Sequence, residues 1–126
     1  MTRDEAQRYA ETWAAAWNAR DVEAVLAHFN DDVSFTSPTA LKVVGTATVH
    51  GKAELRAYWN KALSQVRALH FTLDRVAWDP ASRELAIMYL QEVDGHLTRV
   101  SENLTFGIDG KVASAEVFHG LTGIAL

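Results

Sequence analysis

Three residues in the C-terminal half of the chain have side chains that can move a proton or polarise an oxygen: Tyr89, Glu102 and His119. Each lies where apolar and polar residues alternate, which is the pattern of a β-strand with one buried face. A carboxyl group on an apolar face loses hydration, which raises its pKa and makes it a candidate general acid or base. In that chemistry Glu102 and His119 exchange the proton while the Tyr89 hydroxyl positions the substrate. The structural alternative is a buried polar network without chemistry.

Two Asp-Gly pairs align the strands that carry these residues. Asp94-Gly95 and Asp109-Gly110 each separate alternating segments, and this dipeptide favours the type I′ turn of a two-residue hairpin. Such a turn fixes the register, so Ile87 pairs with Glu102, and Glu102 pairs with Val117. The inner face of the resulting antiparallel meander carries Leu85, Ile87, Tyr89, Gln91, Val100, Glu102, Leu104, Phe106, Ala115, Val117 and His119.

On this face Tyr89 and His119 are diagonal neighbours of Glu102, about 7 to 8 Å away and within reach of long side chains. His119 is the candidate base, and its alternative role is a core histidine paired with Glu102. Tyr89 and Gln91 would orient a ligand, although a tyrosine on a sheet face also serves packing.

Two helices are predicted near the N-terminus. The segment Thr2-Arg3-Asp4-Glu5 has the spacing of a capping box, and apolar residues then recur every three or four positions from Arg3 to Asn18. Asp21 is a suitable N-cap for a second helix, whose apolar stripe runs over 22–29 before the polar turn Asn30-Asp31-Asp32.

The middle of the chain predicts one strand and a third helix. Residues 33–37 alternate and stop at Pro38, which indicates a short strand near a sheet edge. Residues 39–50 have a loop-like composition, with room for a short strand over 41–44. The third helix starts near Gly51 and carries one apolar face.

The order of the elements predicts the fold class. Near Asp74-Arg75 the apolar residues of one strand shift from odd to even positions, which indicates a bulge where the strand bends. Helices in the first half and strands in the second predict an α+β fold, with helices on one face of a curved, mainly antiparallel sheet. The chain has 126 residues, 48% of them hydrophobic, which suits one domain over residues 1–126.

Composition excludes several classes of function. The formal net charge is −4 and the basic residues are scattered, so no nucleic-acid partner is expected. The chain has no cysteine and no closely spaced histidine pair, so no metal site is expected, and no cofactor-binding motif is present. The charged N-terminus and the absence of an apolar run of about 20 residues predict no membrane segment and a cytoplasmic location.

Four short stretches, in this order, resemble the nuclear transport factor 2-like superfamily in its SnoaL-like and ketosteroid-isomerase-like branch. They are Trp17-Asn18-Ala19-Arg20-Asp21, Phe29-Asn30-Asp31-Asp32-Val33, His50-Gly51-Lys52 and Gly110-Lys111-Val112. The resemblance implies a cone in which three helices of the N-terminal half close over a curved sheet, with a pocket between. It also implies varied activities, because members include isomerases, polyketide cyclases, dehydratases and proteins with no chemistry.

Aligned with ketosteroid isomerase, the chain keeps one of three functional groups. The resemblance places Trp13 at the position of that enzyme's tyrosine donor, Ser37 at the position of its aspartate base and Glu102 at the position of its protonated aspartate. Because serine replaces the base, steroid isomerisation by that mechanism is not expected.

The predicted ligand is a small, flat, mostly apolar molecule. Its contacts are expected from aromatic residues of the helices and from the inner sheet face, although aromatic stripes at helical spacing are also ordinary core. The predicted ligand-binding residues are Trp13, Trp17, Phe35, Ser37, Trp59, Gln91, Val100 and Val117.

The outer face of the meander leads to the hypothesis of a homodimer, with apolar residues scattered on the surface as the alternative. Met88, Leu90 and Phe118 share this face with Arg99 and Ser101, and a partly apolar exposed sheet face often marks a protein interface. Three hypotheses follow for the whole chain: a cofactor-free acid/base enzyme of isomerase, cyclase or dehydratase type, a binding module without chemistry, and a dimeric interaction domain whose pocket is filled by its own side chains.

Overall fold

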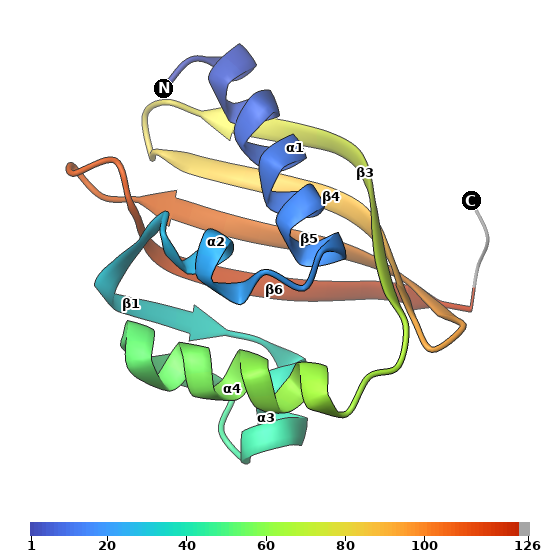
Figure 1. The fold of residues 1–126 in the computed structure, drawn as a ribbon. Coiled ribbons are helices and arrows are strands. Elements are labelled where there is room, and N and C mark those ends of the chain that lie inside the picture. The colour runs from blue at the N-terminus through green and yellow to red at the C-terminus, as the bar shows by residue number, and fades with distance from the viewer. Residues whose placement is uncertain (124–126) are drawn as a thin grey trace.

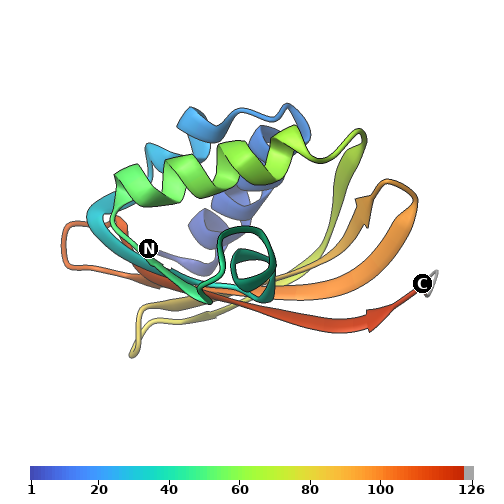
Figure 2. The same cartoon turned by 90° about the horizontal axis from the view of Figure 1, so that it is seen from below.

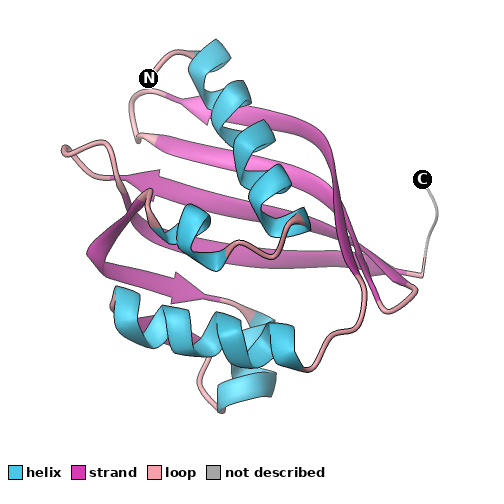
Figure 3. Cartoon of the chain, viewed as in Figure 1, coloured by secondary structure: helices cyan, strands magenta, loops and turns pink. Residues whose placement is uncertain are grey.

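The fold is described for residues 1–123 of a computed structural model. Within this range four helices pack on one face of a six-stranded, curved sheet, so the predicted α+β class is confirmed (Figures 1 and 2). The strand order is β2-β1-β6-β5-β4-β3, and all neighbouring pairs are antiparallel except β1 with β6 (Figure 3). The elements are α1 (Arg3–Asn18), α2 (Val22–Leu26), β1 (Phe29–Thr36), α3 (Pro38–Val44), β2 (Thr48–His50), α4 (Lys52–Ser64), β3 (Leu69–Asp79), β4 (Glu84–Val93), β5 (His96–Phe106) and β6 (Val112–Thr122).

Helix α1 has the predicted bounds and the predicted cap. The Thr2 hydroxyl accepts a hydrogen bond from the Glu5 amide at 3.1 Å, and the Glu5 carboxylate accepts one from the Thr2 amide at 2.9 Å. This reciprocal pair satisfies two amides at the start of the helix. The buried stripe of α1 includes Trp13 and Trp17 and packs on β3. Among residues 1–123, no helix is both long enough and apolar enough to cross a membrane.

The second helix is shorter than predicted. It ends at Leu26, and Phe29 already belongs to β1, where it is fully buried. The polar residues 30–32, predicted as a turn, form an irregular stretch of this strand, where the Asn30 side chain accepts a hydrogen bond from the Asp32 amide at 2.8 Å. This local hydrogen bond satisfies a backbone amide where the regular strand pairing is interrupted.

The prediction of a loop over 39–50 was wrong. Pro38–Val44 is helix α3: the Ser37 hydroxyl caps it by accepting from the Thr39 amide at 3.1 Å, and Gly45 ends it with a φ of 81°. Serine at the N-cap, proline at the first position and a left-handed glycine after the last are standard helix boundaries. Strand β2 then follows and pairs with β1.

The predicted register of the meander is confirmed. Ile87 pairs with Glu102, Glu102 with Val117, and the predicted bulge in β3 lies next to Arg75. The turn at Asp94-Gly95 has φ values of 50° and 84°, as a type I′ turn requires.

The second turn is wider than predicted. The Gly107 amide donates to the Lys111 carbonyl at 2.8 Å, and the Asp109 carboxylate accepts from the Lys111 amide at 3.0 Å. Ile108 therefore does not pair with Lys111. A register shift at Phe106 restores the predicted pairing from Thr105 to Val100, and a second shift follows before Thr98.

Candidate functional site

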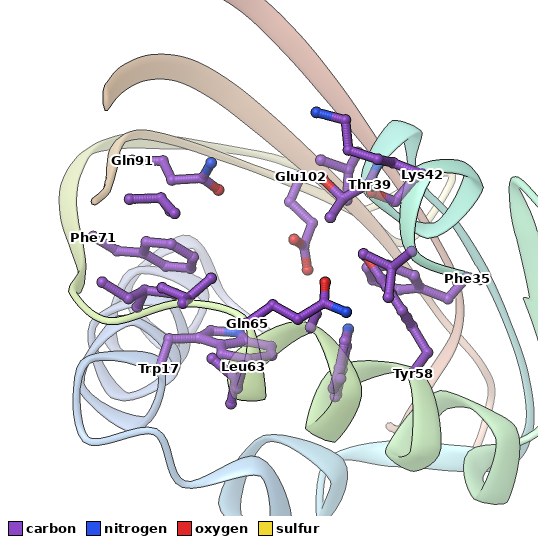
Figure 4. A pocket seen from close by; sticks show the side chains of 18 of the residues that line it. Trp17, Phe35, Thr39, Lys42, Tyr58, Leu63, Gln65, Phe71, Gln91 and Glu102 are labelled. Carbon is purple, nitrogen blue, oxygen red and sulfur yellow. Dashed lines mark hydrogen bonds between the residues drawn. The ribbon is translucent and has the colours of Figure 1, made fainter. Parts of the chain in front are cut away.

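A cavity of about 370 Å³ lies between the inner face of the sheet and helices α3 and α4 (Figure 4). Its volume is in the range typical of small-molecule sites. The wall is mostly apolar, and the carboxyl group of Glu102 and the amide groups of Gln65 and Gln91 point into it. The cavity therefore combines an apolar lining with a few separated polar groups.

Glu102 is the buried acid of this cavity. Its side chain projects from the middle of β5, in a row between Ile87 and Val117, and the residue is only 5% exposed. Burial raises the pKa of Glu102 to about 8, while an interaction with the Tyr89 hydroxyl opposes the shift. Among residues 1–123 the Oε2 atom has no hydrogen-bond partner. A ligand oxygen or proton can therefore interact with this carboxyl group without displacing another contact.

Two tyrosines stand near the acid. Burial and the charge of Glu102 raise the pKa of Tyr89 well above its usual range. Burial also raises the pKa of Tyr58 to about 12, although hydrogen bonding with Ser37 and Thr39 opposes the increase. Both hydroxyls stay protonated at neutral pH and can donate a hydrogen bond.

Aromatic rings form one wall of the cavity. Trp59 is at its centre, with ring centroids 4.8 Å from Trp17 and 5.3 Å from Phe35, both in edge-to-face arrangements. Phe71 from β3 continues the wall and lies 4.7 Å from the ring of Tyr89. The rings of this wall thus come from four elements, α1, β1, β3 and α4.

The structure brings most of the predicted site residues to the cavity. Those that line it are Trp17, Phe35, Ser37, Trp59, Tyr89, Gln91, Glu102 and Val117. Trp13 does not line it, and instead packs against Tyr89 with a centroid distance of 5.1 Å. Val100 is buried in the sheet but also lies outside the lining. Ser37 caps α3, so its hydroxyl is already engaged.

His119 is not placed in the cavity. It pairs with Val100 on the predicted face, but it is exposed and does not line the cavity. Partial burial and the charge of Lys42 lower the pKa of His119. The predicted register places His119 on the correct face of the sheet, but its ring does not reach the cavity that contains Glu102.

Twelve lining residues were not predicted as part of the site, and four of them bear on its chemistry or its aromatic wall: Lys42, Tyr58, Gln65 and Phe71. Tyr58 and Phe71 belong to apolar patterns that the sequence does show, so their burial was predictable. Lys42 lies on α3, which was not predicted, and Gln65 follows the last turn of α4, where no periodicity indicates a direction.

The other acid of the lining is already engaged. The Asp94 carboxylate accepts hydrogen bonds from the Arg67 amide at 2.9 Å and the Ala68 amide at 2.8 Å. These bonds lower the pKa of Asp94, which stays ionised. In the part of the chain that the structure describes, no three His, Cys, Asp or Glu side chains gather as a metal-binding group.

Solved structures share this architecture. A SnoaL-like protein of unknown function from Burkholderia thailandensis is 30% identical, with a TM-score of 0.85 over 95% of this chain and 98% of that one. SalBIII, described as an epoxide hydrolase/cyclase-like enzyme in pyran ring formation in the polyether salinomycin, is 17% identical with a TM-score of 0.74 over 97% of both chains. TerC, co-crystallised with polyporic acid, is 17% identical with a TM-score of 0.74 over 94% of this chain and 91% of that one.

The family comparison agrees with the structures. No curated protein matches the chain. The SnoaL-like domain family matches residues 10–115, which is most of the sequence. The chain therefore belongs to the SnoaL-like domain family, within the nuclear transport factor 2-like superfamily.

Proposed function

We propose that the chain is a cofactor-free acid/base enzyme for a small, mostly apolar molecule that carries a carbonyl oxygen. The observation that carries the proposal is the buried Oε2 atom of Glu102, which faces an apolar cavity without a partner. A pKa of about 8 leaves both protonation states accessible near neutral pH, which suits a group that gives and takes a proton.

The proposed step is proton transfer at the carbon beside the carbonyl. The ionised form of Glu102 accepts that proton, and the C–H electron pair forms an enolate. The enolate oxygen accepts a hydrogen bond from Tyr89 or Tyr58, whose hydroxyls are protonated. The carboxylic acid then returns the proton. His119 has no part in this step.

The test is hydrogen–deuterium exchange in a simple aromatic ketone. With 1-tetralone in deuterated buffer, the protein should catalyse deuterium incorporation beside the carbonyl, and the rate should rise with pH up to about 8 as Glu102 ionises. Glu102→Gln should lower the catalysed rate by at least about 100-fold, the usual contribution of a general base. Glu116→Gln is the matched control, because Glu116 is exposed outside the cavity. Equal exchange by wild type and Glu102→Gln contradicts the proposal.

The second candidate is a binding protein without chemistry. It is favoured because, among residues 1–123, no second carboxylate or imidazole is free beside Glu102: Asp94 is engaged and His119 lies outside the cavity. A designed binder of 17-OHP, 18% identical to this chain, shares the fold. Under this alternative, 1-tetralone binds to both wild type and Glu102→Gln, but neither exchanges deuterium.

We also propose that two copies associate through the outer sheet face. Met88, Ser101 and Phe118 form one row across three neighbouring strands, and Phe118 is 47% exposed. Leu90 and Arg99 form the next row. The helices cover only the opposite face, so an aromatic side chain stays in water unless a partner covers it (Figure 2).

A further inference from the structure

The edge of the cavity carries a positive charge that has no partner among residues 1–123. Lys42 projects from α3 and lines the cavity, and Figure 4 shows its side chain at the cavity's edge. Within residues 1–123 its ammonium group forms no salt bridge and no hydrogen bond. By contrast, the ammonium group of Lys52 lies 3.9 Å from the Asp31 carboxylate.

The other ionisable groups at the cavity do not balance this charge. The Asp94 carboxylate is held by the backbone amides of Arg67 and Ala68 and belongs to the wall. Glu102 is uncharged for the most part at neutral pH, because burial raises its pKa to about 8. The charge of Lys42 also helps to lower the pKa of His119, which keeps that ring neutral. The free charge at the cavity is therefore positive, although the chain as a whole has a net charge of −4.

We propose that the natural ligand is an amphipathic anion, whose negative group binds Lys42 at the cavity edge while its apolar body lies against the aromatic wall near Glu102. The inference rests on the proposed function, because it assumes that the cavity holds the substrate. The Gln65 amide points into the same cavity and offers further hydrogen bonds. The substrate class is thus narrowed to carboxylates, sulfonates or phenolates of aromatic or polycyclic molecules.

Two fluorescent probes with the same aromatic body test the charge preference. 8-Anilinonaphthalene-1-sulfonate is an anion, and N-phenyl-1-naphthylamine is its neutral counterpart. Relative to wild type, Lys42→Gln should weaken binding of the sulfonate about three- to tenfold, as expected for a partly exposed ion pair with hydrogen bonds. The affinity for the neutral probe should not change. Lys61→Gln is the matched control, since Lys61 is an exposed lysine of α4 outside the lining. Raising the salt from about 0.02 to about 0.5 M should shrink the effect of Lys42→Gln.

A second variant locates the probes. Ala62 is half-buried and lines the cavity, so Ala62→Trp should fill it and weaken both probes. If both probes respond to Ala62→Trp but Lys42→Gln changes neither, the anionic ligand is refuted and the cavity remains a binding site. If the neutral probe fails to bind wild type, or binds Ala62→Trp equally well, the cavity does not take an apolar body and the proposed function fails together with this inference.

Discussion

Glu102 is tolerated in the interior because it carries a proton there. In the unfolded chain its pKa is about 4.5, whereas burial raises the pKa to about 8 in the folded protein. Between these values the folded state holds a proton that the unfolded state releases. The stabilising contribution is therefore complete below about pH 4.5 and is lost as the pH rises towards 8.

This difference predicts a slope in stability. The free energy of unfolding should fall by about 1.4 kcal/mol per pH unit between about pH 5 and 8, relative to Glu102→Gln, which has no titrating group at this position. Urea unfolding of both proteins at several pH values measures the difference between their free energies of unfolding. The titrations of all other groups are the same in both proteins and cancel in this difference. Parallel curves for the two proteins would show that Glu102 is ionised in the folded state.

Individual residues of the site differ in how well the sequence predicts them. Glu102 and Val117 were placed correctly because the register of one tight turn and the alternation of the strands determine a face. His119 has the right face but not the right surroundings, since alternation does not tell where the covering helices end. Lys42 and Gln65 could not be predicted, because their direction depends on elements packed from elsewhere in the chain.

At the scale of elements, the cavity depends on a short connection between α4 and β3. Arg20 donates hydrogen bonds to the carbonyls of Leu63, Val66 and Arg67, at 3.3, 3.1 and 2.8 Å. From the other side, the hairpin turn at Asp94 accepts from the backbone amides of this connection. Two elements distant in sequence thus hold one wall of the cavity.

Removing the Asp94 carboxylate should loosen this wall. Asp94→Ala leaves the amides of Arg67 and Ala68 without their acceptor and places alanine at a φ of 50°, which aspartate tolerates better. We expect a loss of about 1 to 2 kcal/mol, similar to the loss of a helix cap, and faster hydrogen exchange at both amides. Asp32→Ala, at an exposed carboxylate without a hydrogen bond among residues 1–123, is the control. Unchanged exchange at the two amides would contradict the assigned role.

The sequence did not predict the elements whose formation depends on contacts with residues far away in the chain. Helix α3 has suitable caps at Ser37 and Gly45, but it spans seven residues and buries only Ala40, so periodicity gives no signal. Strand β2 has three residues and is defined by its pairing with β1. The parallel pairing of β1 with β6 joins residues about 80 positions apart, which no local pattern reveals.

At the scale of the whole molecule, the curved sheet has one covered and one uncovered face, and the proposed dimer uses the uncovered one. If two copies pack through the row that contains Phe118, a charge there is buried against an apolar partner and separates them. We expect wild type to have twice the mass of the single chain by light scattering at micromolar concentration, and Phe118→Asp to have the mass of one chain. Ile108→Asp introduces the same charge at a residue that is 94% exposed in the β5–β6 turn, and it should leave the dimer intact. A wild-type protein that is monomeric at this concentration rules out the interface, whereas the cavity, which lies on the other side of the sheet, is unaffected by that outcome.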